Sequence, residues 1–208
     1  MTTRNGRRHP SARMFAIPAA LLTVAAAASP AFAGAPRTHD GFLLRLSAGV
    51  GSAESENDPE SLPGLKFSGF SGDYNFAVGG MVSENLALHG TLFGWSISDP
   101  DVEFLDQTGT VSDETLTMTG LGGGITYYAM PANIYLSPSV GLGFLSLDDE
   151  ETDAGFAFDA TIGKEWWVGG SWGLGLAGSV GYHSIPQDGV DSNWEGPSFG
   201  LRFSATLN

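Results

Sequence analysis

The sequence predicts an all-β fold, an eight-stranded antiparallel up-and-down transmembrane β-barrel that follows a cleaved signal peptide. Three observations predict this fold class. Apolar residues recur at every second position in long segments, short and long connections alternate between these segments, and a basic and then apolar leader precedes them. Alternation with a period of two indicates strands, because successive side chains of a strand point to opposite faces.

Residues 1–33 are typical of a secretory signal peptide. Four arginines precede an apolar segment of 15 residues at 14–28, and Ala31-Phe32-Ala33 follows as a small-x-small cleavage site. A transmembrane helix is the alternative, but such a helix needs about 20 apolar residues, and Pro30 ends this segment early. We therefore predict bacterial export and cleavage before Gly34, which leaves residues 34–208 as one barrel domain.

Eight segments of the mature chain carry the alternating pattern. In the first, Phe42, Leu44 and Leu46 share one face, whereas Arg45 and Ser47 share the other. The eight predicted strands are 42–50, 74–82, 86–98, 116–128, 134–146, 156–168, 172–182 and 199–207. Strands of about 9 to 14 residues are longer than the roughly 5–6 of soluble sheets, and they suit the roughly 9–11 that a tilted strand needs to cross a bilayer.

The connections alternate in length along the chain. Three are tight turns rich in Gly, Pro, Asn and Ser, at 83–85, 130–133 and 169–171. Four are longer and acidic, at 51–69, 99–115, 147–155 and 184–196. This alternation is typical of a membrane barrel with short turns on the periplasmic rim and long loops on the outer rim.

The polarity of the two faces predicts which one contacts lipid. The less apolar face carries mainly Gly, Ser, Thr and Ala, which suit the narrow inside of an eight-stranded barrel better than a solvated exterior. A soluble sandwich or ligand-binding barrel, with the apolar face inside, is the alternative. Aromatic residues gather near the short turns, and we predict an interfacial girdle of Tyr127, Tyr128, Tyr135, Trp166, Trp167 and Trp172.

The mature chain resembles the small eight-stranded bacterial outer-membrane β-barrel proteins, the broad family that includes the OmpA barrel and OmpX. The resemblance covers residues 34–208 and rests on the architecture and on the last strand, where Gly200-Leu201-Arg202-Phe203 is similar to the family's C-terminal assembly signal. The family usually ends on an aromatic residue, whereas this chain ends Leu207-Asn208. The resemblance implies a monomer in the outer membrane that contacts its lipids, is inserted by the barrel-assembly machinery and holds no cofactor.

Composition excludes several classes of function. The chain has 23 acidic and 9 basic residues, a net charge of −14, which argues against sequence-independent binding to nucleic acid. The absence of Cys excludes a disulfide scaffold and a thiolate metal site. Most acidic residues fall in the long connections, where divalent cations such as Ca²⁺ could screen them. A solvated, repulsive surface is the alternative to a specific cation site.

Charged residues are also predicted inside the barrel. Arg45, His89, Glu165 and Arg202 take inward positions at about four to six residues from the short-turn rim, and Asp159 lies further along the lumen. Because buried charges need partners, we predict an ion-pair layer, centred on Glu165, that plugs the lumen. The alternative is a water-filled lumen in which these side chains do not contact one another.

No catalytic motif stands out. His183 and the adjacent Ser184 point to opposite faces of their strand, and the glycine-rich run at 120–124 is followed by more strand rather than by a helix that could cradle phosphate. We therefore predict a protein that is not an enzyme and that stabilises the envelope or interacts through its surface loops. A narrow channel or conduit for ions or small hydrophobic molecules is the alternative, and a lipid-modifying enzyme is the third candidate.

Overall fold

The computed structural model describes residues 39–59, 64–105, 107–148, 150–187 and 192–207. The predicted signal peptide, residues 1–33, lies outside the described residues. The strands are β1 (Phe42–Asn57), β2 (Leu65–Ser83), β3 (Leu86–Ser98), β4 (Asp101–Phe104), β5 (Gln107–Thr110), β6 (Thr115–Ala129), β7 (Ile134–Leu147), β8 (Glu150–Glu151), β9 (Gly155–Trp167), β10 (Trp172–Pro186) and β11 (Asn193–Leu207).

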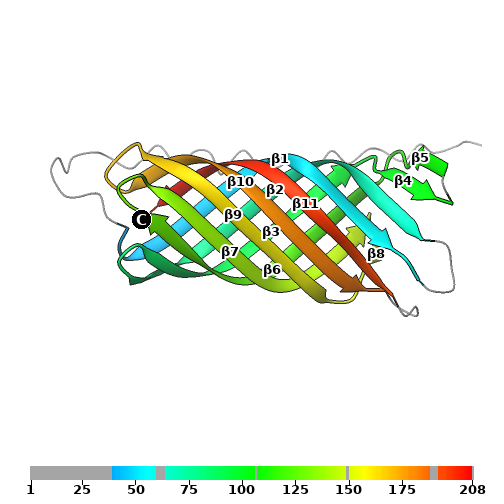
Figure 1. Ribbon diagram of the computed structural model, residues 1–208, viewed down its shortest axis with the longest axis horizontal. Coiled ribbons are helices and arrows are strands. Elements are labelled where there is room, and N and C mark those ends of the chain that lie inside the picture. Colours follow the sequence, from blue (N-terminus) through cyan, green and yellow to red (C-terminus); the bar gives the residue numbers. More distant parts are fainter. Residues whose placement is uncertain (1–38, 60–63, 106, 149, 188–191, 208) are drawn as a thin grey trace, which may run out of the picture. The chain divides into compact units, whose positions relative to one another are not determined.

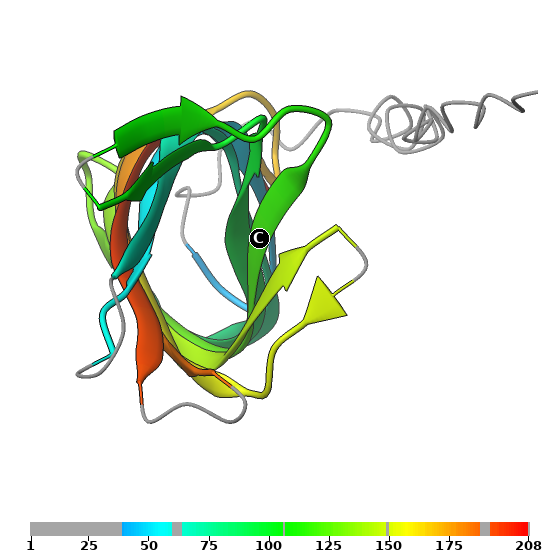
Figure 2. The same ribbon diagram turned by 90° about the vertical axis from the view of Figure 1, so that its right-hand side faces the viewer.

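Eight long strands close into a barrel. Each pairs antiparallel with two neighbours in the order β1-β2-β3-β6-β7-β9-β10-β11, and β1 pairs with β11 to complete the ring. Leu44 of β1 therefore lies opposite both Val78 of β2 and Leu207 of β11. Figure 1 shows the strands inclined to the long axis, and Figure 2 looks along that axis. The predicted eight-stranded antiparallel up-and-down barrel is confirmed.

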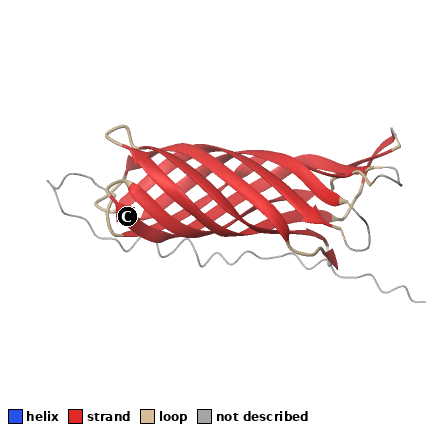
Figure 3. Cartoon of the chain, turned by 60° about the horizontal axis from the view of Figure 1, so that its bottom comes forward, coloured by secondary structure: helices blue, strands red, loops and turns tan. Residues whose placement is uncertain are grey.

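The two ends of the barrel differ in their connections. Short turns join β2 to β3, β6 to β7 and β9 to β10 at the end where the C-terminus lies, which we call the turn end (Figure 1). In these turns Asn85 (φ 61°) and Asn133 (φ 53°) adopt the left-handed conformation that asparagine tolerates. The longer connections lie at the opposite end, the loop end. Figure 3 shows strands and loops, and no described segment is a helix long and apolar enough to cross a membrane.

Several strands extend further towards the loop end than predicted. β1, β2 and β11 are longer, so the connections predicted at 51–69 and 184–196 are shorter, and the one predicted at 99–115 contains the hairpin of β4 and β5. In the added part of β1, Ser52 and Glu54 take the outward positions. Strand pairing continues there although the outward side chains are polar, which is why hydrophobic alternation did not reveal it.

Large apolar side chains cover the outside of the barrel. Phe70 is 73% exposed and Leu201 is 71% exposed, whereas the inward Arg45 and Ser47 are buried. Other exposed apolar residues are Val50, Val78, Leu88, Leu121, Leu136, Leu142, Ile162, Leu176 and Phe199. An apolar surface that surrounds the molecule is what a membrane-spanning barrel presents to lipid, and it excludes the soluble barrel with its apolar face inside.

Candidate functional site

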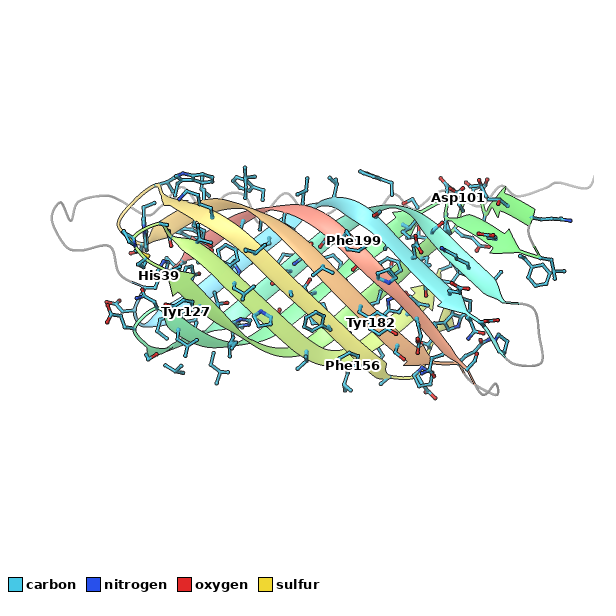
Figure 4. All side chains as sticks on the ribbon, in the orientation of Figure 1. His39, Asp101, Tyr127, Phe156, Tyr182 and Phe199 are labelled. Atoms are coloured by element: carbon cyan, nitrogen blue, oxygen red, sulfur yellow. The ribbon has the colours of Figure 1, made fainter. Side chains whose placement is uncertain are left out.

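Side chains fill the lumen in three successive groups. An aromatic and polar group that includes His39 and Arg45 lies at the turn end, an ion-paired group around Arg202 lies in the middle, and an apolar group around Trp95 lies towards the loop end. Figure 4 shows His39 at one end of the barrel and Asp101 at the other. Because the lumen would be the route of any transport, these groups decide what the barrel can do.

Arg202 forms the ion pairs in the middle of the lumen. Its Nε donates to Asp73 Oδ1 at 2.6 Å, and its Nη2 donates to Asp159 Oδ2 at 2.6 Å. Nη1 also donates to Asp159 Oδ1 at 3.0 Å, so the Arg202–Asp159 pair is bidentate. We call these three side chains the central ion-pair group. They come from β11, β2 and β9, which are not neighbours in the sheet, so the group links the barrel wall across the lumen.

Neutral side chains also donate hydrogen bonds to the two carboxylates. Ser179 Oγ donates to Asp73 Oδ2 at 2.9 Å, and Asn75 Nδ2 donates to Asp159 Oδ1 at 2.9 Å. Gly200 makes room for the group, because a Cβ at that position would clash with Asp73 Oδ2. Hydrogen bonds of this kind offset part of the cost of burying two carboxylates with one guanidinium.

Arg45 lies nearer the turn end and has neutral partners. Its Nη2 donates to Thr126 Oγ1 at 3.1 Å and to Ser137 Oγ at 2.6 Å. Its guanidinium carbon lies 4.5 Å from the centroid of the Tyr135 ring, which is the distance of a cation–π contact. His89 Nε2 lies 3.0 Å from Thr126 Oγ1, so His89 belongs to the same polar group.

Glu165 is not the centre of an ion-pair layer, contrary to the prediction. Its Oε1 accepts a hydrogen bond from Thr206 Oγ1 at 2.6 Å, and no ion pair joins it to an arginine in the described chain. Of the five predicted lumen residues, the structure joins only Arg202 and Asp159 in an ion pair. The carboxylate that sequence reasoning missed is Asp73.

The strand register explains the error. Arg45 lies opposite Thr206 across the β1–β11 seam, whereas Arg202 lies opposite Gly49, further from the turn end. The number of residues between a side chain and the turn of its own strand is therefore a poor guide to the depth of that side chain in the lumen. Asp73 was missed because the predicted second strand begins one residue later. The signal for it was present, since Asp73 shares the inward parity of Asn75.

Only some residues of the predicted aromatic girdle face the outside of the barrel. Tyr127 and Trp166 are about half exposed on the outside, and Trp172 is partly exposed. Tyr128 and Tyr135 are instead completely buried in the lumen. Consecutive residues of a strand face opposite sides, so Tyr127 and Tyr128 cannot both reach lipid. For the same reason Trp166 faces outwards, whereas Trp167 lies beside His39 at the turn end of the lumen.

His39 closes the turn end of the lumen. Its ring stacks on Tyr128, with centroids 3.5 Å apart and planes inclined by 12°, and it lies 5.0 Å from the ring of Trp167. Nε2 donates to Asn133 Oδ1 at 2.7 Å. Gly41 (φ 77°) then turns the chain into β1, a conformation that glycine adopts without strain. No sequence pattern pointed to His39, because it precedes the first alternating segment.

Apolar side chains close the other half of the lumen. Trp95, Phe93 and Ile97 of β3 are each 1% exposed. The whole group, which we call the apolar plug, consists of Ala53, Phe67, Phe93, Trp95, Ile97, Leu116, Met118, Leu145, Ala157 and Ile185. Interiors of this kind pack without space for water, so the plug obstructs the lumen below the loops.

A serine–histidine pair lies beside the apolar plug. Ser55 Oγ is 2.9 Å from His183 Nε2, and both residues are completely buried. The His183 ring also lies 5.7 Å from the ring of Trp95. Sequence reasoning missed the pair because Ser55 falls in the predicted connection 51–69. With both side chains buried, the pair has no exposed nucleophile to offer a substrate in this structure.

The loop end carries exposed acidic groups with local partners. Lys66 Nζ pairs with Glu54 at 2.7 Å. Glu195 accepts hydrogen bonds from Ser184 Oγ and Tyr182 Oη, each at 2.8 Å, and these bonds hold the pKa of Glu195 below its usual value. No group of three His, Asp or Glu side chains in the described ranges could hold a metal ion. Cation binding at this rim stays a prediction.

Comparison with solved structures identifies the fold. Neisserial surface protein A (NspA) matches over 80% of this chain and 96% of its own, with 13% sequence identity and a TM-score of 0.51. The chain has the fold of a small eight-stranded outer-membrane barrel. OprG from Pseudomonas aeruginosa (10% identity, 84% of this chain and 100% of its own, TM-score 0.49) and AlkL (16%, 86% and 95%, 0.47) are also similar to this barrel. No protein-family model and no curated protein matches the sequence.

Proposed function

We propose that this barrel is a bacterial outer-membrane protein with a closed lumen, whose turn end faces the periplasm and whose acidic loop end faces outwards. Its role is to stabilise the envelope and to interact with other molecules through the loop end. The observation that carries the proposal is the filled lumen, in which the central ion-pair group and the apolar plug obstruct the same path in succession. An open channel needs a continuous polar path, which these two groups interrupt.

Two other features support the membrane part of the proposal. The outward apolar surface suits outer-membrane lipids, and the leader at 1–33 suits export and cleavage before Gly34. Insertion would use the barrel-assembly machinery, and the completed β1–β11 seam leaves the wall without a free edge for oligomerisation, which supports a monomer.

The first experiment combines fractionation, mass spectrometry and gel mobility. We expect the protein in the outer-membrane fraction, with the mass of residues 34–208 and with a migration in cold SDS that changes on boiling. A soluble periplasmic protein without heat-modifiable migration would contradict the membrane assignment.

The second experiment tests the closed lumen. Purified barrel reconstituted into planar lipid bilayers is expected to give no conductance above that of a protein-free control. Conductance steps that depend on the folded protein would favour the channel instead. Unchanged lipid A and phospholipid profiles in overexpressing cells are expected, and altered profiles would favour the lipid-modifying enzyme.

A further inference from the structure

The hairpin of β4 and β5 leaves one strand edge open at the loop end. β4 pairs with β2 on one side and with β5 on the other, whereas β5 pairs only with β4 in the described part of the chain. All four residues of β5 are exposed. The eight strands of the barrel wall each have two neighbours, so this edge is an exception to the closed sheet (Figures 1 and 2).

The pairing of the hairpin shows which backbone groups the open edge presents. Val111 N donates to Pro100 O at 3.0 Å, so this pair is hydrogen-bonded. Hydrogen-bonded and non-hydrogen-bonded pairs alternate along an antiparallel ladder, which makes the next pair, Thr110 with Asp101, non-hydrogen-bonded. Thr108 follows two residues away with the same orientation. The N–H and C=O groups of Thr108 and Thr110 therefore point away from β4, at the spacing that an added strand needs.

The edge is short, at four residues, but it lacks the other features that usually protect exposed strands. Natural edge strands carry lysine, proline or a bulge that prevents further pairing. The sequence of β5, Gln107-Thr108-Gly109-Thr110, has no lysine and no proline, and its register with β4 is regular. At the tip of the hairpin, Phe104 is 44% exposed and Leu105 is 63% exposed. An added strand would meet these apolar side chains at one end.

The negative charge around this edge indicates what kind of strand could bind there. The segment 99–115 has six acidic residues and no basic one, and Asp101 and Glu103 lie directly opposite Thr110 and Thr108. Two copies of the chain that paired through β5 would bring like charges together, which is unfavourable. An extended segment with lysine or arginine would gain attraction instead.

We propose that β5 binds an extended basic segment of a partner protein by strand addition. Backbone hydrogen bonds to Thr108 and Thr110 would supply the affinity, and the acidic residues of β4 would select positive charge. The inference rests on the proposed function, since that function places the loop end outside the cell. It deepens that function by naming the edge and the chemistry of the partner.

The test uses the full mature barrel in zwitterionic detergent micelles and three synthetic peptides. The first is an end-blocked peptide of nine residues in which lysine and threonine alternate. The second is the same peptide with methyl groups on the backbone nitrogens that would face β5, and the third has glutamate in place of lysine. We expect the first peptide to bind at least ten times more tightly than either of the others, and to slow hydrogen exchange at the amides of Thr108 and Thr110.

Two matched variants separate strand addition from simple charge attraction. Thr108→Pro removes an outward N–H that β4 does not use, so the hairpin should be retained and binding should weaken at least tenfold. Thr108→Val keeps that N–H and should bind like the wild type. Retained heat-modifiable migration shows that both variants are folded.

Clear outcomes would overturn the proposal. Equal binding of the methylated peptide, or unchanged binding to Thr108→Pro, would show charge attraction without strand addition. No saturable binding of the lysine peptide would also overturn it. None of these three results bears on the closed lumen. Conductance in planar bilayers, in contrast, would contradict the proposed function whatever the peptides do.

Discussion

Arg202 and Asp73 are 129 positions apart in the sequence, yet their side chains form an ion pair of 2.6 Å across the lumen. The strands that carry them, β11 and β2, are separated in the sheet by β1. The contact is therefore made through the lumen rather than along the wall. Asp159 of β9 completes the same group from a third direction. The group therefore joins three strands of the wall across the lumen.

The first prediction concerns the removal of this arginine. Arg202→Met leaves Asp73 and Asp159 buried without their cation, and we expect the free energy of unfolding to fall by about 3–5 kcal/mol. The measurement is urea-induced unfolding in lipid vesicles, followed by tryptophan fluorescence.

The matched control removes all three charges together. The triple variant Asp73→Asn, Asp159→Asn and Arg202→Met has no uncompensated charge, so it should recover most of the lost stability. A triple variant that is no more stable than Arg202→Met would show that packing, rather than charge compensation, explains the effect.

The second prediction compares two phenylalanines on opposite faces of the wall. Phe93 of the apolar plug is 1% exposed, whereas Phe199 is 56% exposed on the outside. Phe93→Ala leaves a cavity in the lumen and should cost about 3–5 kcal/mol of unfolding free energy. Phe199→Ala should cost clearly less, because lipid chains can occupy the vacated space. Equal losses in vesicle unfolding experiments would contradict this assignment of the two faces.

The sequence predicted the strands of the barrel wall better than the contacts between side chains in the lumen. Alternation along each strand was enough to place Arg45 inside and Leu44 outside, because parity is a local property. Which inward side chains meet depends on the register between strands, and the register is not visible in one strand alone. Arg202 was therefore predicted near Glu165, although it pairs with Asp159 and Asp73.

The other missed residues have separate causes. Ser55 lies on a part of β1 where the outward side chains, Ser52 and Glu54, are polar, so the alternating pattern did not include it. Asp73 lies one residue before Tyr74, where the predicted second strand begins. His39 lies before the first strand and reaches the lumen only because Gly41 turns the chain. Hydrophobic periodicity detects strands that contact lipid, and it cannot detect their continuation into water or a segment that folds into the lumen.

The third prediction concerns the ionisation of Glu195. Hydrogen bonds from Ser184 and, to a smaller extent, Tyr182 lower the pKa of this exposed carboxyl group. Ser184→Ala should therefore raise the pKa of Glu195 towards its ordinary value, and Tyr182→Phe should raise it less. The measurement is a titration of the carboxyl carbon by NMR.

The pH dependence of stability follows from the same shift. A carboxyl group with a lowered folded pKa stabilises the native state above its unfolded pKa, and this contribution is lost as the pH falls through the folded value. Because Glu195 is exposed, we expect a contribution of less than about 1 kcal/mol. A pKa of Glu195 that is the same in Ser184→Ala and the wild type would contradict the role of the hydroxyl group.

The fourth prediction concerns the closure of the turn end by His39. Its ring covers Tyr128 and lies beside Trp167, so His39→Ala should open a path for water to the Trp167 ring. We expect a larger fraction of the tryptophan fluorescence to be quenched by iodide in this variant.

His39→Phe keeps an aromatic ring over Tyr128 but loses the hydrogen bond to Asn133, and it should restore most of the protection. Thr110→Ala, on the exposed strand β5 at the other end of the barrel, is the control and should leave the quenching unchanged. Equal quenching of the wild type and His39→Ala, with all variants folded by gel mobility, would show that His39 does not close the turn end.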